Sequence, residues 1–266
     1  MKALVLSAGY GERLRPLTDT TPKPLLEIGG RPLIHYPLLM LRQAGITEVA
    51  INLHHLGRAI EEALGDGAAL GLRITYSYEP TLAGTGGPLA ILRDYFGGDR
   101  FVMLNCDTIL DLDLSALLDF HVRKGGLATF VLRTSVDSGA YSQIECGSDA
   151  RIRRMRLLKG RSRGLYDDYP ATLERQTDAG VQPYMYCGVM ACEPGVCSMI
   201  KRPPPFSLMG DLFAPLLAQN TPLYGYVHDG FFRTVDDRAG YEDVRAEFGA
   251  TPPRLRYLDA AANPPR

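Results

Sequence analysis

Two glycines and three basic residues follow the first apolar run of the chain. Residues 3–6 are apolar, and after them come Gly9, Gly11, Arg13, Arg15 and Lys23. Because glycine lacks a Cβ, the chain can turn there so that consecutive backbone N–H groups point at one anion. The basic side chains add positive charge around the same point. The stretch therefore predicts a buried strand that runs into a phosphate-binding loop.

This loop differs from the glycine-rich loop of dinucleotide-binding proteins. Leu14 stands where the third glycine of GxGxxG would be. Pro16, Pro22 and Pro24 disfavour a long helix that starts here, since proline lacks a backbone donor and restricts the residue before it. We expect an extended, basic loop, which suits a triphosphate better than a pyrophosphate on a helix N-terminus. An NAD-dependent oxidoreductase is a remote alternative.

Residues 6–25, LSAGYGERLRPLTDTTPKPL, resemble the pattern LxxGxGxRLxPLTxxxPKPL of the sugar-1-phosphate nucleotidyltransferases, also called NDP-sugar pyrophosphorylases. The resemblance implies a Rossmann-like, three-layer α/β/α fold with a mixed, mostly parallel central sheet. It also implies a reaction of a nucleoside triphosphate with a sugar 1-phosphate, which gives an NDP-sugar and pyrophosphate with Mg²⁺ as cofactor. No hexapeptide repeat is present, so we expect no β-helix domain.

The composition is that of an ordinary soluble protein. The 266 residues include 29 Lys and Arg against 30 Asp and Glu, a formal charge of -1, which does not indicate a nucleic-acid partner. The five cysteines are odd in number and contain no CxxC pair, which argues against disulfides and a zinc site. No signal peptide and no apolar stretch of about 18 residues is seen, so we expect a cytoplasmic protein without a membrane partner. A homo-oligomer is compatible with the sequence.

Predicted strands and helices alternate along the chain, as in a parallel sheet with covered faces. We expect helices at 32–45, 59–64, 88–95, 114–124, 207–218 and 239–248, and strands at 48–52, 72–78 and 101–105. Residues 160–181 show no periodicity and are interpreted as a long loop or a short insertion, with a lid or an oligomer contact as the alternatives for its role. We predict a single domain over 1–250, with a nucleotide-binding half at about 1–110 and a sugar-binding half at about 111–250. A Pro-rich tail, 251–266, is expected to fray.

A second glycine-rich loop, residues 82–88, precedes the predicted helix 88–95. By itself it is also compatible with a simple turn from a strand to a helix. The resemblance implies that it holds the base and ribose, and its form favours GTP, as in mannose-1-phosphate or heptose-1-phosphate guanylyltransferases. The nucleotide-binding residues implied by the resemblance are Leu6, Ala8, Gly9, Gly11, Gly84, Thr85, Gly86 and Gly87.

Asp107 follows the apolar strand 101–105, where ligands gather in α/β proteins. It matches the metal-binding aspartate of the family, although Cys106 replaces the usual glycine, and a turn-capping role for Asp107 is the alternative. The resemblance thus implies Arg13, Lys23 and Asp107 as catalytic residues. The second metal-binding aspartate of the family falls on Thr234. Asp236 lies two residues on and can substitute for it if the strand continues, so both stay open.

The sugar side departs further from the family pattern. The resemblance places Tyr141, Glu145 and Gly188 near the sugar phosphate, but the usual Glu-Lys-Pro lysine is absent. Lys159 or a nearby arginine would have to replace that lysine. These departures support a rival hypothesis, in which the chain is a catalytically inactive relative that binds a nucleotide or NDP-sugar and regulates a partner.

Overall fold

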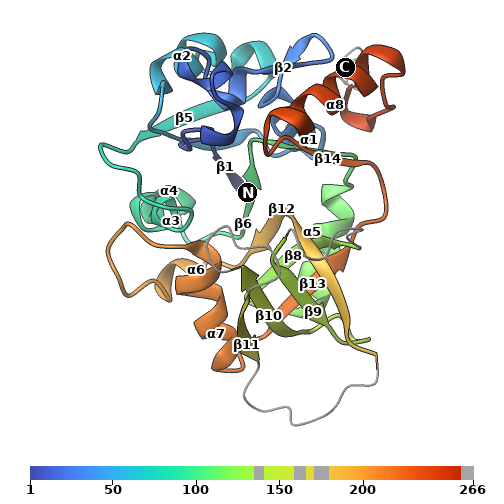
Figure 1. The fold of residues 1–266 in the computed structure, drawn as a ribbon. Helices are drawn as coiled ribbons and strands as arrows, with labels where there is room; N and C mark the ends of the chain where they lie inside the picture. Colours follow the sequence, from blue (N-terminus) through green and yellow to red (C-terminus); the bar gives the residue numbers. More distant parts are fainter. Residues whose placement is uncertain (135–140, 159–165, 171–179, 259–266) are drawn as a thin grey trace. The chain divides into compact units, whose positions relative to one another are not determined.

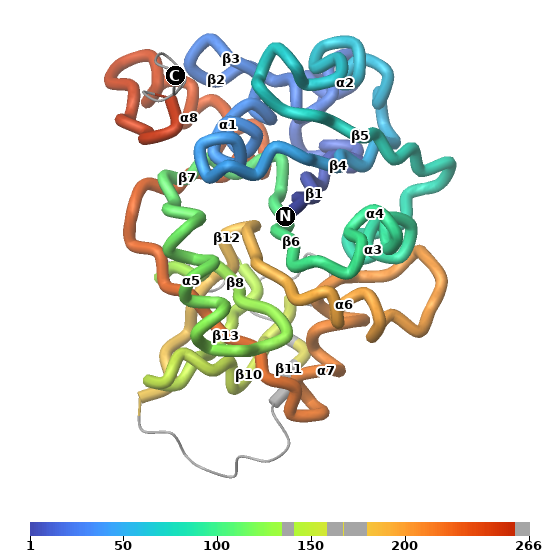
Figure 2. Tube along the Cα trace, turned by 180° about the vertical axis from the view of Figure 1, so that it is seen from behind, coloured from blue at the N-terminus to red at the C-terminus, as the bar shows by residue number. Residues whose placement is uncertain are grey.

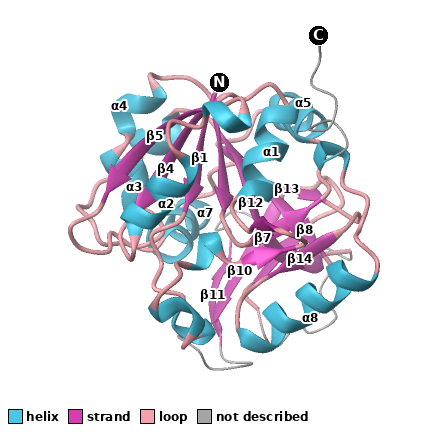
Figure 3. Ribbon diagram, turned by 90° about the horizontal axis from the view of Figure 1, so that it is seen from above, coloured by secondary structure: helices cyan, strands magenta, loops and turns pink. Residues whose placement is uncertain are grey.

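A computed structural model describes residues 1–134, 141–158, 166–170 and 180–258 (Figure 1). Its backbone contacts divide the chain into two compact units. The first unit contains Met1–Leu82, Met103–Leu114 and Gly230–Arg266, and the second contains Ala83–Val102 and Ser115–Asp229. Each unit contains both helices and strands (Figure 3).

Four neighbouring strands lie in the first unit, the first of them only with its residues 103–105. They are ordered β6 (Phe101–Asn105), β1 (Lys2–Leu6), β4 (Glu48–Leu53) and β5 (Arg73–Tyr78). β1 pairs with β4, and β4 pairs with β5, both in parallel. Apolar residues on these strands, such as Leu4 and Ile51, are fully buried, which explains the continuous apolar runs in the sequence.

Helices and two small antiparallel strand pairs complete the first unit. They are η1 (Glu12–Leu14), η2 (Leu17–Asp19), η3 (Lys23–Leu25), β2 (Glu27–Ile28), β3 (Arg31–Pro32), α1 (His35–Gln43), α2 (Gly57–Leu64), η4 (Ala68–Leu70), β7 (Thr108–Leu110), β14 (Phe232–Thr234) and α8 (Arg238–Ala250). α8 packs beside β2 (Figure 2). Its Phe248 ring meets Tyr36 of α1 edge-on, with 5.8 Å between ring centroids, so the C-terminal helix is part of the core of this unit.

The second unit contains a mixed sheet. β11 (Tyr166–Pro170), β10 (Ile152–Leu158), β9 (Gln143–Cys146), β12 (Gln182–Cys192) and β8 (Ala128–Arg133) pair in antiparallel fashion along that order, and β13 (Leu223–Val227) joins β8 in parallel. Its helices are α3 (Gly87–Ile91), α4 (Arg93–Phe96), α5 (Leu114–Lys124), α6 (Gly195–Ser198), the π-helix η5 (Leu208–Phe213) and α7 (Ala214–Ala218).

The strand β11 corrects the interpretation of residues 160–181 as a loop. Residues 166–170 pair along β10, with Met155 opposite Tyr169 and Leu157 opposite Asp167. An edge strand obtains its backbone hydrogen bonds from its neighbour, so it does not need an apolar pattern of its own. That is why the sequence of this segment gave no sign of it.

The part of the C-terminal tail that the structure describes is packed, so the expectation that it frays is wrong for residues 251–258. Leu255 and Tyr257 are each 1% exposed. Between them, Arg256 donates from its backbone N to Asp111 Oδ1 (2.9 Å) and from its guanidinium to Asp111 Oδ2 (3.1 Å) and the Asp111 carbonyl (2.9 Å). The burial of Leu255 and Tyr257 and the hydrogen bonds from Arg256 to Asp111 offset the conformational entropy that is lost when this segment becomes ordered.

All five cysteines are free and buried. Among the helices in the described ranges, none has the length and apolar character needed to cross a membrane.

Candidate active site

The first glycine-rich loop leaves the carboxyl end of β1 and continues through η1, η2 and η3. Gly11 has a φ of +63°, and a Cβ on it would lie 2.8 Å from Thr18 Cγ2. Thr18 Oγ1 also donates to the Gly11 carbonyl (2.9 Å), which closes the loop on itself. A larger residue at position 11 would therefore strain the backbone and displace Thr18. By contrast, a Cβ on Gly9 would meet nothing within 4 Å, so open space lies beside Gly9.

Short 3-10 helices present the two predicted catalytic cations. Arg13 lies in η1, where the neighbouring Leu14 is fully buried and anchors the turn. Lys23 is the first residue of η3, directly after Pro22. The loop is thus not extended as expected, although it forms no long helix. The third basic residue, Arg15, pairs with Asp19 (3.2 Å) instead of joining this group.

The carboxylates come from two segments that are far apart in the sequence. β7 and β14 pair in antiparallel fashion with Thr108 opposite Thr234. The backbone N of Val235 then donates to the carbonyl of Asp107 (3.0 Å). This pairing brings Asp107, just before β7, close to Asp236, just after β14. Because β14 ends at Thr234, Asp236 reaches the site from the turn that leads into α8.

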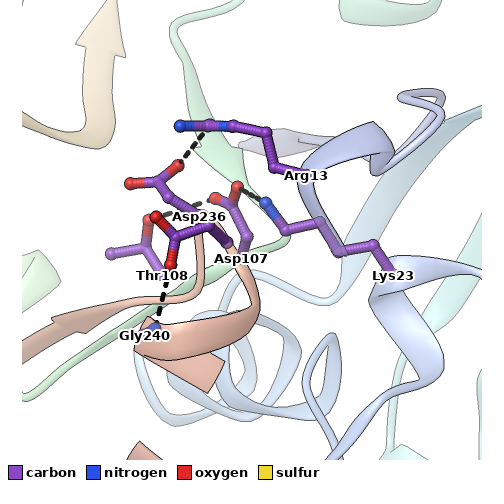
Figure 4. Close-up of polar contacts among 7 residues, drawn as sticks. Arg13, Lys23, Asp107, Thr108, Asp236 and Gly240 are labelled. Atoms are coloured by element: carbon purple, nitrogen blue, oxygen red, sulfur yellow. Dashed lines mark hydrogen bonds and ion pairs between the residues drawn. The ribbon is translucent and has the colours of Figure 1, made fainter. Parts of the chain in front are cut away.

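The two cations and the two carboxylates pair with one another (Figure 4). Lys23 Nζ forms an ion pair and short hydrogen bond with Asp107 Oδ2, and these side chains are 13% and 18% exposed. Arg13 Nη2 donates to Asp236 Oδ1 (3.0 Å), with Arg13 55% and Asp236 28% exposed. Asp237 caps α8 by accepting a hydrogen bond from Gly240 N (2.9 Å), which fixes the backbone after Asp236. The structure therefore brings Arg13, Lys23, Asp107 and Asp236 together in one group.

The group is electrostatically coupled. Burial raises the pKa of Asp236, and the nearby charge of Asp107 raises it further, against the opposing effects of Lys23 and Arg13. Burial alone would lower the pKa of Lys23, but the charge of Asp107, with smaller contributions that include Asp236, raises it above its usual value. The lysine is thus held charged, and the two carboxylates repel each other.

Cys106, which replaces the family glycine, fits its place. It is 7% exposed. The described non-glycine residues with positive φ are Leu56, Ala150 and Asn220, so position 106 does not require the backbone freedom of glycine. Burial, together with the charge of Asp107, raises the pKa of the Cys106 thiol to about 12, so the thiol adds no charge near the loop.

The donor set fits a magnesium ion that arrives with a phosphate ligand. Within the described ranges, no three His, Cys, Asp or Glu side chains come together as a metal site. However, Mg²⁺ in proteins is often held by one or two carboxylates and completes its coordination with substrate phosphates and water. Asp107 and Asp236 could supply the two carboxylates, whereas Thr234 is paired in β14 and would add only a neutral donor.

Sequence reasoning missed a buried polar chain behind the loop. Ser7 lies between the predicted nucleotide contacts Leu6 and Ala8, and its N–H donates to Asn52 Oδ1 (2.8 Å). Asn52 Nδ2 in turn donates to Glu79 Oε1 (2.8 Å), and both side chains are buried. These polar residues interrupt or follow apolar strands at their carboxyl ends, which was the available signal. They fix the start of the glycine-rich loop.

The remaining predicted residues belong to the second unit or fall outside the described ranges. Residues 84–87 pack against 204–208. Glu145 of β9 pairs with Arg154 (3.5 Å), and Tyr141 precedes the same strand. Gly188 has a φ of +76° in β12, where the register with β8 shifts. Lys159 lies outside the described residues.

Comparisons with known proteins define the class. The sequence model described as nucleotidyl transferase matches residues 2–156. The chain therefore belongs to the nucleotidyl transferase family.

The chain is also similar to individual curated proteins. The chain is 54% identical over 119 residues to N-acetylmuramate alpha-1-phosphate uridylyltransferase of Neisseria meningitidis, covering 44% of this chain and 51% of the relative. It is 31% identical over 242 residues to mannose-1-phosphate guanyltransferase of Debaryomyces hansenii, covering 88% and 61%. The chain thus spans between half and two thirds of the length of these relatives.

A solved structure shares the fold. HddC of Yersinia pseudotuberculosis superimposes with a TM-score of 0.73 over 93% of this chain and 99% of that chain, at 16% identity. The predicted Rossmann-like α/β fold with a mixed sheet is confirmed.

Proposed function

We propose that this protein is a sugar-1-phosphate nucleotidyltransferase, which converts a nucleoside triphosphate and a sugar 1-phosphate into an NDP-sugar and pyrophosphate. The observation that carries the proposal is the group of Arg13, Lys23, Asp107 and Asp236 beside the glycine-rich loop. Cations there can bind phosphates, and two coupled carboxylates can hold a divalent cation against them.

The chemistry requires alignment and charge neutralisation more than covalent catalysis. A phosphate oxygen of the sugar phosphate attacks the α-phosphorus, and the bond from that phosphorus to the β-phosphate oxygen breaks, releasing pyrophosphate. The attacking group and the target are both anions, so positioning and electrostatic stabilisation lower the barrier.

The residues of the first unit have distinct roles in this proposal. Gly9 and Gly11 let backbone N–H groups face the phosphates, and Arg13 and Lys23 neutralise the charge that develops on the leaving pyrophosphate. Asp107 and Asp236 hold Mg²⁺, which when bound neutralises charge on the α-phosphate. Lysine has three N–H donors and arginine has five, so both can contact phosphates in addition to their present carboxylate partners. If they turn fully to the phosphates, both carboxylates become free for the metal.

The nucleotide substrate that we propose for this protein is either GTP or UTP. The form of residues 82–88 favours GTP, in line with the 31% identical mannose-1-phosphate guanyltransferase. The relative with 54% identity over a shorter stretch is a uridylyltransferase that acts on N-acetylmuramate alpha-1-phosphate, which supports UTP. The assay should therefore begin with two substrate pairs. These are GTP with mannose 1-phosphate and UTP with N-acetylmuramate 1-phosphate.

The test is pyrophosphate release with Mg²⁺, measured for GTP, UTP, dTTP, CTP and ATP against a panel of sugar 1-phosphates. We expect release with one pair and, in Lys23→Met, a loss of at least about a hundredfold in kcat. Arg73→Met is the matched control, because Arg73 forms an exposed ion pair with Glu48 elsewhere in the same unit. Full activity of Lys23→Met would refute the assignment.

A further inference from the structure

In the second unit, the glycine-rich loop 84–87 is packed tightly against residues 204–208. A Cβ on Gly86 would lie 2.2 Å from Phe206 Cε2, and one on Gly84 would lie 2.5 Å from the carbonyl oxygen of Phe206. A Cβ on Gly87 would meet Ala83 and Pro204. Phe206 itself is 4% exposed, so its ring is buried in this contact.

Three hydrogen bonds join the same two segments. Gly86 N donates to the Phe206 carbonyl (3.0 Å), and Phe206 N donates to the Ala83 carbonyl (3.1 Å). Leu208 N donates to Thr85 Oγ1 (2.9 Å). The N–H of Gly86 is therefore already bonded within the protein, and the glycines at 84 and 86 are explained by packing without any ligand.

The two glycines are required for different reasons. Gly86 has φ −98° and ψ −24°, which any L-residue can adopt, and the three atoms nearest to its Cβ position belong to the Phe206 ring. Gly84 has φ +75°, and the atoms close to its Cβ position belong to the Phe206 backbone. Only the constraint on Gly86 can be removed by shortening the side chain at 206.

We propose that Phe206 is the positioning residue of this loop, and that position 86 is glycine because of the Phe206 ring and not because of a bound nucleotide. The inference rests on the proposed function, in which the loop holds the base and ribose. Phe206 acts from behind the loop, by restricting it to one conformation before the nucleotide binds. Such preorganisation increases affinity because less conformational entropy is lost on binding.

The experiment first identifies an active pair of substrates for the wild-type protein, then measures KM for each substrate and kcat. Phe206→Val should raise KM for the nucleoside triphosphate by about tenfold or more, with a small effect on KM for the sugar phosphate. A residue with only a structural role would lower stability without separating the two KM values. Thermal unfolding of each variant is measured in parallel.

The decisive variants combine both positions. Valine lacks Cδ2, Cε2 and Cζ, the three Phe206 atoms nearest to the Gly86 Cβ position. Gly86→Ala should weaken nucleotide binding strongly, and adding Phe206→Val should return KM to within about threefold of Phe206→Val alone. Gly84→Ala is the matched control, because Phe206→Val cannot relieve its backbone clash and should not rescue it.

Three results are distinguishable. Rescue of Gly86→Ala but not of Gly84→Ala supports the inference. A double variant that binds nucleotide as poorly as Gly86→Ala alone would show that the nucleotide requires this glycine, and would overturn the inference, as would an unchanged KM in Phe206→Val. A wild-type protein that releases no pyrophosphate with any pair contradicts the proposed function instead, and a thermal shift by nucleotides then reads out the same variants.

Discussion

Replacing Lys23 with methionine tests the charge arrangement of the candidate site without relying on turnover. The substitution keeps the length of the side chain and removes its charge. Lys23 and Asp107 are both largely buried, so the variant leaves a buried carboxylate without its cation, at a cost of about 3–5 kcal/mol in the free energy of unfolding. For a protein of this size, this corresponds to a Tm lower by on the order of 10 °C.

The same variant should respond to Mg²⁺ in the absence of nucleotide. Lys23 competes with any metal for Asp107, and removing a unit charge about 4 Å away is worth up to about 4 kcal/mol at an effective dielectric constant of about 20. Tenfold tighter Mg²⁺ binding needs only about 1.4 kcal/mol of this. We therefore expect MgCl₂ to raise the Tm of Lys23→Met much more than the Tm of the wild type.

The assay is thermal unfolding of both proteins across a MgCl₂ titration, with Lys23→Met/Asp107→Asn as the control. The double variant has no buried unpaired carboxylate at 107, so its Tm should recover and its Mg²⁺ response should disappear. The reasoning would be refuted if Lys23→Met unfolded at the wild-type temperature, or if its Mg²⁺ response equalled that of the wild type.

Three further outcomes can be measured. Asp236→Asn should lower kcat for pyrophosphate release by at least about a hundredfold, while Thr234→Val should change it by less than about tenfold, because the carboxylate is at 236; equal losses would contradict this. Burial lowers the pKa of His121 despite the charge of Glu193, so the unfolded state binds more protons below about pH 6.5. Urea unfolding should therefore show stability falling as pH drops from about 6.5 towards the lowered pKa, with a flatter profile in His121→Gln. The buried Tyr257 hydroxyl has no hydrogen-bond partner among the described residues, so Tyr257→Phe should raise the free energy of unfolding by about 1 kcal/mol, and a clear loss of stability would show that the hydroxyl is bonded.

Strands that have a clear local pattern of apolar and polar residues were predicted correctly from the sequence. The strands 48–52, 72–78 and 101–105 match β4, β5 and β6 within one residue at each end. The first and third are mainly apolar runs, and residues 72–78 alternate between apolar and polar side chains. The glycine-rich loop was also recognisable. Its short 3-10 helices were not expected, because the prolines were interpreted only as helix breakers, whereas their fixed φ also suits single turns.

The pairing of Asp107 with the segment around Asp236 could not be predicted, because a β-ladder between distant segments creates it. From the sequence, either Thr234 or Asp236 could be the second metal ligand, and Asp236 could take that role only if the strand continued past Thr234. β14 ends at Thr234 instead, and the turn to the capped helix α8 brings Asp236 towards Arg13. Alternation along a strand gave no information on a residue that lies beyond its end.

The charges of the candidate site bear on the choice between an enzyme and a regulatory relative that only binds a nucleotide. Carboxylates beside a triphosphate-binding loop repel the ligand, so a protein selected only to bind nucleotide would gain affinity by losing Asp107 and Asp236. Burial, together with the repulsion from Asp107, raises the pKa of Asp236, which is a further cost. A divalent cation held between carboxylates and phosphates offsets both costs. The presence of both carboxylates, each paired with a cation that can turn to the phosphates, therefore favours metal-assisted transfer over binding alone.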